Sequence, residues 1–265
     1  MNKLIVAIIQ ARMGSSRLPN KVMKLIKGRP MLSYMIERLG FSKKINKIVI
    51  ATSTSEKDDP IVDFCINENV LHYRGSEDDV LDRFYKTAKE FKAEIILRFT
   101  ADCPLVDPVI IDELISLFIN EGNMDHMNTG HSFPEGADAE ILSFSTLEKA
   151  WKDATLKTER EHVTTHIWSN PEKFNTKPFQ YSRNLSKYRY TVDEEQDFKV
   201  VESIFNSLYK KNEIFFLEDI IEYLDSNPDV FKLNEGIIRN EGLFKSIEEE
   251  GATKILEEYK KMRDD

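Results

Sequence analysis

A basic loop near the start of the chain has the residue types that hold a polyphosphate. The segment QARMGSSRLPNK, residues 10–21, directly follows an apolar run from Leu4 to Ile9. It contains three cations and a turn-forming Gly-Ser-Ser sequence, namely Arg12, Gly14, Ser15, Ser16, Arg17 and Lys21. Free backbone N–H groups, guanidinium forks and a compact ammonium group match phosphate oxygens. The segment is neither GxxxxGK[ST] nor GxGxxG, so the P-loop and the dinucleotide fingerprint do not apply. A solvated basic loop is the alternative.

Two aspartates elsewhere in the chain could hold a metal ion opposite that loop. Asp102 lies in FTADCPLVDP after a hydrophobic run, and Asp193 lies in YTVDEEQDF before a helical pattern. Ligands of a parallel sheet bind beyond the carboxyl ends of its strands, so these carboxylates can face the basic loop. Mg²⁺ prefers oxygen ligands and substrate phosphates. For Asp193 a helix N-cap is an equally good assignment, whereas Asp107 is expected to cap a helix that begins at Pro108.

The elements that must position these residues alternate between strand and helix over the first 120 residues. Expected strands are Leu4–Ile9, Lys47–Thr52, Val70–Tyr73 and Glu94–Thr100, and expected helices are Met31–Leu39, Asp59–Asn67, Val80–Phe91 and Pro108–Asn120. A continuous apolar, β-branched run such as the first is typical of a strand buried on both faces. Alternation with short loops predicts an α/β fold, with a mainly parallel central sheet flanked by helices and right-handed crossovers.

Beyond residue 122 the pattern changes. We expect strands at Ala139–Phe144 and Lys187–Thr191, and helices from an N-cap at Ser145 to Asp153, at Glu159–Ser169, Glu194–Tyr209 and Leu217–Leu224, and over a charged tail from Glu241 to Arg263. No Gly/Ser-rich linker divides the chain, and no fixed-period repeat is present. The chain is therefore interpreted as one elaborated domain with a helical C-terminal segment.

Composition excludes several classes of protein. The chain has 265 residues, a formal net charge of −9 and two cysteines. An acidic chain does not suit a nucleic-acid coat, although a small anion can still bind in a locally basic pocket. The apolar runs are too short for a membrane span or a signal-peptide core, and two cysteines are too few for a disulfide framework. We expect a soluble, cytoplasmic protein without nucleic-acid partners or membrane insertion.

Read in order, the motifs resemble the cytidylyltransferases of the acylneuraminate and ketodeoxyoctonate type, and most closely the branch named for spore coat polysaccharide biosynthesis protein F. The matching segments are QARMGSSRLPNKV, ATSTSEKDDPIV, YRGSEDDVLDRFYKTA, TADCPLVDP, FPEGADAEI, EREHVTTHI, YTVDEEQDF and NEGIIRNEGLFKSI. The resemblance implies a nucleotide-diphospho-sugar transferase fold of GT-A-like type. It implies a nucleotidyltransferase domain at 1–227, with a nucleotide-binding half at 1–122 and an acceptor and dimerisation half at 123–227, followed by a helical segment at 228–265.

The resemblance also implies roles for particular residues. The nucleotide-binding residues would be Gln10, Ala11, Arg12, Met13, Gly14, Ser15, Ser16, Arg17, Lys21, Arg74, Asp78 and Arg83. Asp102 and Asp193 would hold Mg²⁺, and the residues lining the acceptor side would be Glu140, Glu161 and His162. Arg12, Lys21 and Asp102 would be catalytic. Where the family commonly has glycine before the metal-binding aspartate, this chain has Ala101.

The implied reaction is in-line attack of an acceptor oxygen on the α-phosphorus of CTP, with release of pyrophosphate. Lys21 and Arg12 would stabilise the leaving group, and Mg²⁺ would bridge phosphate oxygens and the acceptor. The acceptor would be a sugar acid or a phosphorylated small molecule used in surface polysaccharide synthesis, and the enzyme would be a homodimer. Two other functions stay open: a sugar-1-phosphate nucleotidylyltransferase that uses another nucleoside triphosphate, and a catalytically weak nucleotide-binding module.

Three residues of the EREHVTTHI segment have competing assignments. His162 and His166 lie four residues apart, a spacing found in zinc sites, but no HExxH pattern or third ligand accompanies them. We therefore interpret His162 as an acceptor-side hydrogen-bonding residue and His166 as structural. Glu161 is either an acceptor ligand or a residue on a solvent-facing helix surface.

Overall fold

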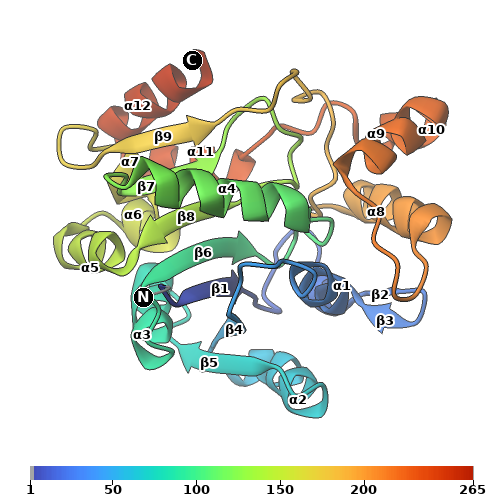
Figure 1. The fold of residues 1–265 in the computed structure, drawn as a ribbon, viewed down its shortest axis with the longest axis horizontal. Coiled ribbons are helices and arrows are strands. Elements are labelled where there is room, and N and C mark those ends of the chain that lie inside the picture. The colour runs from blue at the N-terminus through green and yellow to red at the C-terminus, as the bar shows by residue number, and fades with distance from the viewer. Residues whose placement is uncertain (1–2, 265) are drawn as a thin grey trace.

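A seven-stranded sheet forms the centre of the computed structural model, which describes residues 3–264 (Figure 1). Its strands are β1 (Ile5–Gln10), β4 (Lys47–Ser53), β5 (Leu71–Gly75), β6 (Ile95–Thr100), β7 (His126–Thr129), β8 (Glu140–Ser143) and β9 (Thr176–Phe179). They lie in the order β5-β4-β1-β6-β8-β7-β9. The first four of these run parallel, β8 runs antiparallel to β6 and β7, and β9 runs parallel to β7. A short hairpin pairs β2 (Leu25–Ile26) with β3 (Arg29–Pro30).

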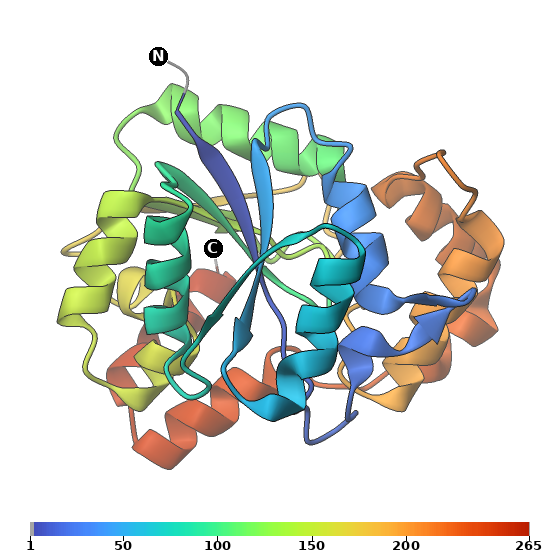
Figure 2. The ribbon, with the colours of Figure 1, turned by 90° about the horizontal axis from the view of Figure 1, so that it is seen from below.

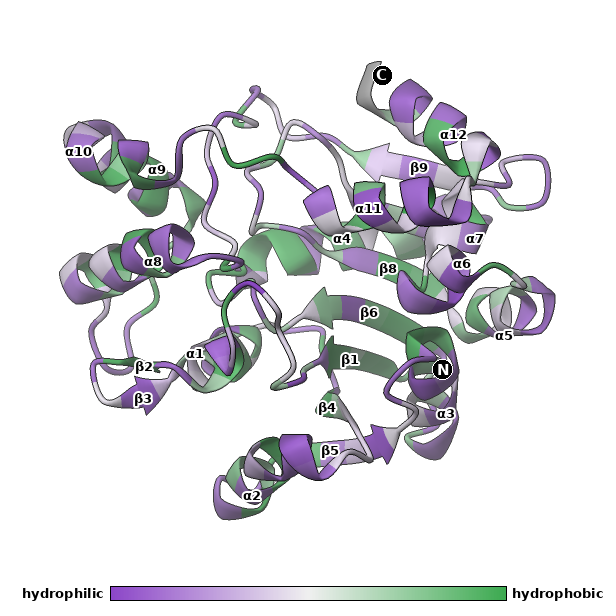
Figure 3. Cartoon of the chain, turned by 180° about the vertical axis from the view of Figure 1, so that it is seen from behind, coloured by the Kyte–Doolittle hydropathy of each residue, from purple (hydrophilic) through white to green (hydrophobic). Residues whose placement is uncertain are grey.

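Helices cover both faces of the sheet (Figure 2). One face carries α1 (Met31–Leu39), α2 (Asp59–Asn67) and α4 (Pro108–Glu121). The other carries α3 (Val80–Glu90), α5 (Phe144–Asp153) and α7 (Thr165–Trp168). Successive side chains of a strand point to opposite faces, so β1 sends alternate apolar residues into both layers. Burial on both sides explains why β1 and β6 are mostly hydrophobic, as Figure 3 shows.

The remaining helices extend the molecule beyond the sheet. They are α6 (Lys157–Glu161), α8 (Glu195–Leu208), α9 (Leu217–Ser226), α10 (Pro228–Phe231), α11 (Glu241–Glu250) and α12 (Thr253–Asp264). α8 and α9 pack with the β2–β3 hairpin and with Tyr34 of α1, whose ring centroid lies 4.3 Å from that of Phe205. α11 and α12 pack through Ile247, Ile255 and Tyr259 against Trp168. The C-terminal helices therefore lie against α7, beside the site described below.

This architecture confirms the predicted α/β class, the mainly parallel sheet flanked by helices and the helical C-terminal extension. The segments expected at 1–122 and 228–265 include residues 1, 2 and 265, which lie outside the described residues. Within the described part of the chain, no helix is both long enough and apolar enough to cross a membrane.

Several local predictions were wrong for identifiable reasons. The expected helix Glu159–Ser169 is divided into α6 and α7, because Val163 has a φ of 48° that a continuous helix does not allow. The expected strand Lys187–Thr191 forms a single bridge, between Arg189 and Glu135. Ser143 rather than Ser145 caps α5, by accepting a hydrogen bond from the N–H of Thr146. The charged tail is divided into α11 and α12 at Gly251, whose φ is +65°. Strands β7 and β9 and the short hairpin were not expected.

Candidate active site

Two adjoining cavities lie beyond the carboxyl ends of β1 and β6. The first, which we call the loop cavity, has a volume of about 390 Å³ and is lined by the basic loop. The second, the sheet cavity, has a volume of about 340 Å³ and is lined by residues of β6 to β9 and of the C-terminal segment. The residues that line both cavities are Arg17, Arg98, Thr100, Asp102, His162, Asp193, Glu241 and Gly242. These eight residues form the junction between the cavities.

Most of the residues predicted to act on a nucleotide come together in the loop cavity. The predicted residues that line it are Gln10, Ala11, Arg12, Ser15, Ser16, Arg17, Lys21, Arg83, Asp102, Glu161, His162 and Asp193. Met13 and Gly14 belong to the same loop, and Glu140 lines the sheet cavity. The order of the strands produces this result, because β1 and β6 are adjacent and parallel, so the segments that follow them start at the same edge.

The conformation of the basic loop leaves backbone donors available. The N–H of Met13 donates to Asp58 Oδ1 over 2.7 Å, and the carbonyl of Met13 accepts from the N–H groups of Ser15 and Asn20. Among the described residues, the N–H groups of Gly14, Ser16 and Arg17 have no hydrogen-bond acceptor. A turn with several unpaired N–H groups is an anion-binding arrangement. The loop can therefore bind phosphate through its backbone as well as its side chains.

Lys21 lies between the two predicted metal ligands. Its Nζ donates to Asp102 Oδ2 over 2.9 Å and to Asp193 Oδ1 over 3.0 Å. Burial acts to lower the pKa of Lys21, but the charges of the two aspartates outweigh it, so this pKa is raised. Burial acts to raise the pKa of Asp102, but the charge of Lys21 outweighs it, so this pKa is lowered. Lys21 and Asp102 are therefore both charged at neutral pH.

The two aspartates fit a divalent cation. Their carboxylate oxygens already converge on one positive atom, the Nζ of Lys21. No group of three or more His, Cys, Asp or Glu residues in the described part of the chain could hold a metal by itself. Mg²⁺ commonly binds through one or two carboxylates and completes its shell with water and substrate phosphates. The donor set is therefore suited to Mg²⁺ carried by a nucleotide.

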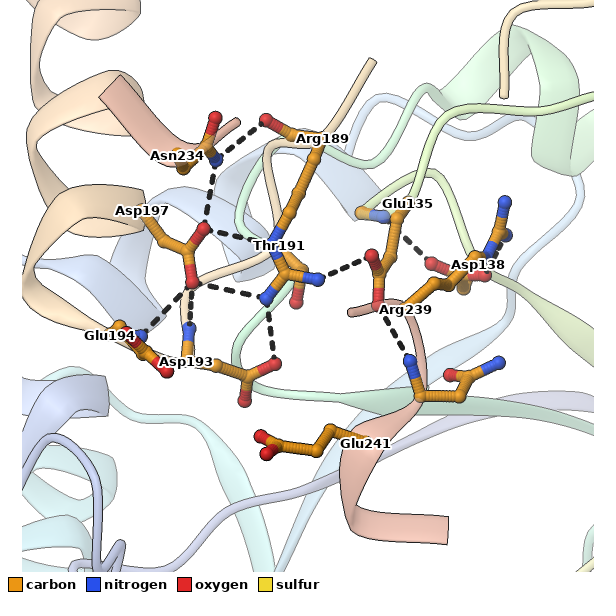
Figure 4. A network of polar contacts seen from close by, with 12 residues as sticks. Glu135, Asp138, Arg189, Thr191, Asp193, Glu194, Asp197, Asn234, Arg239 and Glu241 are labelled. Carbon is orange, nitrogen blue, oxygen red and sulfur yellow. Dashed lines mark hydrogen bonds and ion pairs between the residues drawn. The ribbon is translucent and has the colours of Figure 1, made fainter. Parts of the chain in front are cut away.

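A buried arginine fixes the position of Asp193 (Figure 4). Arg189 donates to Asp193 Oδ2 over 3.0 Å and to both oxygens of Asp197, and it also pairs with Glu135. Asp197 accepts hydrogen bonds from the N–H groups of Asp193 and Glu194, each over 3.0 Å. The N-cap residue of α8 is Glu194, whose N–H bonds to Asp197 in a capping box, so the N-cap assignment for Asp193 is wrong. The side chain of Asp193 is left to point at Lys21. Arg189 was not predicted from the sequence. The one feature that could have indicated it is the presence of a cation within the otherwise uncharged segment YRYTV.

Glu140 is held by partners of its own in the sheet cavity. Its carboxylate pairs with Arg98, accepts from Thr164 Oγ1 over 2.7 Å and lies 3.3 Å from His126 Nε2. Burial acts to raise the pKa of Glu140, but the charge of Arg98 and the hydrogen bond from His126 outweigh it, so this pKa is lowered. Arg98 was not predicted either, although it is the one charged residue within the apolar strand IILRFT.

His162 lies at the junction of the two cavities, and Glu161 lies beside it in the loop cavity. The Nε2 of His162 lies 3.0 Å from the hydroxyl of Ser246 on α11. Burial, together with the charges of Arg98 and Arg12, lowers the pKa of His162 to about 4. His166 is instead bonded to Glu159, over 2.7 Å, so the two histidines do not share a site.

The structure brings Arg83 to the loop cavity but not Arg74 or Asp78. Arg74 donates to the carbonyls of Ser53 and Ser55, each over 2.8 Å, and so holds the loop after β4. Asp78 is exposed and lines neither cavity. Burial and the nearby charge of Arg12 lower the pKa of Arg83 to about 10.

The alanine in place of the family's glycine causes no strain. Ala101 is not among the described residues that have a positive φ, the conformation for which glycine would be required. Its side chain is buried in the core beneath the sheet. The backbone before Asp102 therefore does not depend on glycine.

The C-terminal segment supplies part of the wall of both cavities. Arg239 and Asn240 line the sheet cavity, and Glu241 and Gly242 line both. Glu241 Oε2 accepts from Arg17 over 2.8 Å, and Arg239 pairs with Asp138 over 3.1 Å. These residues were not predicted, because nothing in the charged tail indicates that it returns to the start of the chain.

Together, the parallel sheet, the basic loop and the facing aspartates define a nucleotidyltransferase. The chain belongs to the cytidylyltransferase family, whose model matches residues 6–222. This confirms the resemblance given by the sequence motifs and the predicted nucleotidyltransferase fold and enzyme class. Residues 223–265, which include the C-terminal wall of the cavities, lie beyond the match.

Three relatives illustrate the relationship. The chain is 31% identical over 232 residues to spore coat polysaccharide biosynthesis protein SpsF of Bacillus subtilis, a match that covers 85% of this chain and 95% of that protein. It is 32% identical over 112 residues to the 3-deoxy-manno-octulosonate cytidylyltransferase of Geobacter sulfurreducens, covering 42% of this chain and 44% of the other. The solved structure of a cytidylyltransferase from Leptospira borgpetersenii has 34% identity and a TM-score of 0.83, covering 89% of this chain and all of that one.

Proposed function

We propose that this protein transfers CMP from CTP to an acceptor hydroxyl and releases pyrophosphate. The acceptor would be a sugar acid or a phosphorylated small molecule of surface polysaccharide synthesis. The observation that carries the proposal is the set of contacts in the loop cavity, where Lys21 of the basic loop lies within 3.0 Å of both Asp102 and Asp193. A cytidylyl donor presents a polyphosphate with bound metal, and the cavity offers the cations and the carboxylates that such a substrate needs.

Nucleotide binding exchanges the partners of these charged groups. Asp102 and Asp193 would hold Mg²⁺, which would supply charge neutralisation and Lewis-acid polarisation at the phosphate that is attacked. Lys21 and Arg17 then pair with phosphate oxygens instead of carboxylates. Arg12 and the unpaired N–H groups of the loop bind the remaining oxygens and stabilise the pyrophosphate as it leaves. Catalysis rests on this positioning and on charge neutralisation.

The sheet cavity is the proposed acceptor site. It opens into the loop cavity at the junction, so a hydroxyl held there can approach the α-phosphate from the side opposite the basic loop. Its lining includes several charged side chains, among them Glu135, Asp138, Glu140 and Arg239. Because Arg98 and the hydroxyl of Thr164 already hold Glu140 in one place, this carboxylate can accept a hydrogen bond from an acceptor hydroxyl in a fixed geometry.

The two alternative functions make different demands. A sugar-1-phosphate nucleotidylyltransferase would share the phosphate site and differ in the base it selects. A catalytically weak binding module would have no need for both Asp102 and Asp193 opposite the basic loop. The family match and the presence of both aspartates favour the transferase that uses CTP.

We also propose that the enzyme is a homodimer that pairs through the second half of the domain, residues 123–227. Light scattering at working concentration should give twice the chain mass of 30.8 kDa. A mass of one chain would reject the dimer and leave the proposed reaction untouched.

A pyrophosphate-release assay tests the function directly. The protein is mixed with Mg²⁺ and CTP, GTP, UTP or ATP, each with 3-deoxy-manno-octulosonate, with a sugar 1-phosphate or with no acceptor, and products are identified by mass. We expect release that requires CTP and an acceptor, with a CMP-linked product. Faster release with another nucleotide and the sugar phosphate would support the second function. Tight nucleotide binding without turnover on any acceptor would support the third.

A further inference from the structure

The imidazole ring of His162 lies at the junction of the two cavities, where the acceptor hydroxyl of the proposed reaction would lose its proton. His162 follows the last residue of α6 and precedes Val163, whose left-handed backbone turns the chain between α6 and α7. The ring lines both the loop cavity and the sheet cavity. A hydroxyl that passes from the sheet cavity to a phosphate in the loop cavity therefore passes beside His162.

Hydrogen-bond counting determines which ring nitrogen carries the proton. Ser246 Oγ lies 3.0 Å from His162 Nε2, 3.1 Å from the carbonyl of Gly242 and 3.5 Å from Glu161 Oε2. The hydroxyl has one hydrogen to donate, and the carbonyl and the carboxylate can only accept. If that hydrogen goes to either of them, Nε2–H can donate to Oγ and two hydrogen bonds form. If it goes to Nε2, only one forms. The arrangement favours the Nε2–H tautomer.

In this tautomer the other ring nitrogen, Nδ1, carries no hydrogen and can accept a proton or a hydrogen bond. Among the described residues it has no hydrogen-bond partner. The three carboxylates at the junction are each paired with a cation. Lys21 pairs with Asp102 and Asp193, and Arg17 pairs with Glu241. In the described part of the junction, Nδ1 is the titratable acceptor that no cation holds.

The surroundings of the ring keep it neutral and link its basicity to the nucleotide. The charged groups that face it are Arg12 of the basic loop, Arg98 of β6, Glu140 of β8 and Glu161 of α6, with the Ser246 hydroxyl on α11. Arg98 is paired with Glu140, whereas Arg12 lies in the proposed phosphate site. When phosphate neutralises Arg12, its repulsion of the protonated ring falls and the pKa of His162 rises.

Resting on the proposed function, we propose that His162 is the general base of the reaction and that Ser246 is the positioning residue that holds its tautomer. As the acceptor oxygen forms a bond to the α-phosphorus, its proton moves to Nδ1. The bond from the α-phosphorus to the bridging oxygen breaks, and its electron pair leaves with pyrophosphate. The imidazolium that results faces Glu140 and returns its proton to water. α11, which lies beyond the family match, thereby orients a catalytic residue.

Nitrogen NMR of the full chain tests the tautomer without any acceptor. The protein is labelled with ¹⁵N-histidine, and the His162 signals are identified by their loss in His162→Gln. We expect a protonated Nε2 and an unprotonated Nδ1, and a pKa that rises when CTP and Mg²⁺ are added. Ser246→Ala should lose the preference for one tautomer. A proton on Nδ1 in the wild-type protein, or a pKa that CTP does not raise, would overturn the proposal.

Kinetics with CTP and 3-deoxy-manno-octulosonate test the role in turnover. Removal of a general base typically lowers the rate by about 10²- to 10⁴-fold. We expect His162→Gln to lower kcat about 100-fold or more, with little change in the KM for CTP, and its residual rate to rise with pH as hydroxide replaces the base.

His72→Gln, a change on β5 away from both cavities, is the matched control. Near-normal kcat in His162→Gln would overturn this inference alone. No turnover by the wild-type protein on any acceptor would count against the proposed function, and the NMR result would still decide the tautomer.

Discussion

The guanidinium of Arg17 donates a hydrogen bond of 2.8 Å to the carboxylate of Glu241, which lies 224 residues later in the chain. Arg17 also pairs with Asp193 over 3.0 Å. A cation that we propose to bind phosphate is thus held by two carboxylates, one of which comes from a segment beyond the residues that the family model matches. A triphosphate that binds to Arg17 must displace Glu241 or bind beside its negative charge.

Glu241→Gln should therefore tighten CTP binding. Partly exposed ion pairs are worth about 0.2–1 kcal/mol, so the expected decrease in Kd is roughly 1.5- to 5-fold at low salt. The effect should shrink as added salt screens the charges. Calorimetric titration with CTP and Mg²⁺ measures it, and Glu248→Gln, an exposed change on the same helix, is the control. Weaker binding by Glu241→Gln would mean that Glu241 supports the nucleotide complex instead of opposing it.

Asp102→Asn should lower turnover by at least about 100-fold, because the metal site loses one of its two charges. The change preserves the shape of the side chain and its contact distance from Lys21. Pyrophosphate release as a function of Mg²⁺ concentration measures the loss and should also show that more metal is needed. Asp63→Asn on the exposed side of α2 should behave as wild type. Near-normal activity in Asp102→Asn would exclude this aspartate as a metal ligand.

Lys21→Ala should make thermal stability depend on the metal. Without Lys21 the carboxylates of Asp102 and Asp193 repel each other, so in a chelator the variant should unfold at a lower temperature than wild type. Mg²⁺ should raise its Tm more than that of wild type, since the metal replaces the missing charge. Lys57→Ala, a change at an exposed lysine, is the control. If the Tm falls and Mg²⁺ does not restore it, Lys21 is structural.

The pH dependence of folding should report on His162. Its pKa is about 4 in the folded protein and ordinarily 6.5, so between these values the unfolded chain binds the proton more readily. The contribution of neutral His162 to the free energy of unfolding is therefore fully present above pH 6.5. It decreases as the pH falls towards 4, by an amount on the order of 3 kcal/mol. Denaturant unfolding from pH 7 to pH 4 should show a shallower loss in His162→Gln. Parallel curves for the two proteins would contradict the lowered pKa.

The first half of the fold could be predicted because its buried strands and helices have clear patterns of apolar residues in the sequence. The run from Leu4 to Ile9 lies at the centre of the sheet, and the helix from Val80 has one apolar face. Strands β7 and β9 are short, partly polar and paired with distant segments, so they leave no periodic signal. Tyr188 and Tyr190 give the segment at 187–191 a strand-like pattern, but their rings pack against α8 and α9 instead of extending a sheet.

Residue types and spacing predicted the part of the candidate site that follows strands, and the family resemblance added Glu161, His162 and Asp193. Arg12, Lys21 and Asp102 lie in the segments that follow β1 and β6, and the parallel order of those strands brings these segments together. The partners that fix the site come from afar: Arg189 holds Asp193, and Ser246 holds His162. These contacts depend on where the second half of the chain and the C-terminal helices pack against the sheet. The spacing of residues along the sequence does not indicate such long-range contacts.

Thermal unfolding with CTP, GTP, UTP and ATP, each with Mg²⁺ or with a chelator, tests the central claim most directly. A ligand that binds only the folded state stabilises it by RT ln(1 + [L]/Kd), which is about 2.7 kcal/mol at a hundredfold excess over Kd. The site described here predicts selective stabilisation by CTP that requires Mg²⁺ and is lost in Asp102→Asn. Stabilisation by no nucleotide, or by all four equally without Mg²⁺, would contradict it.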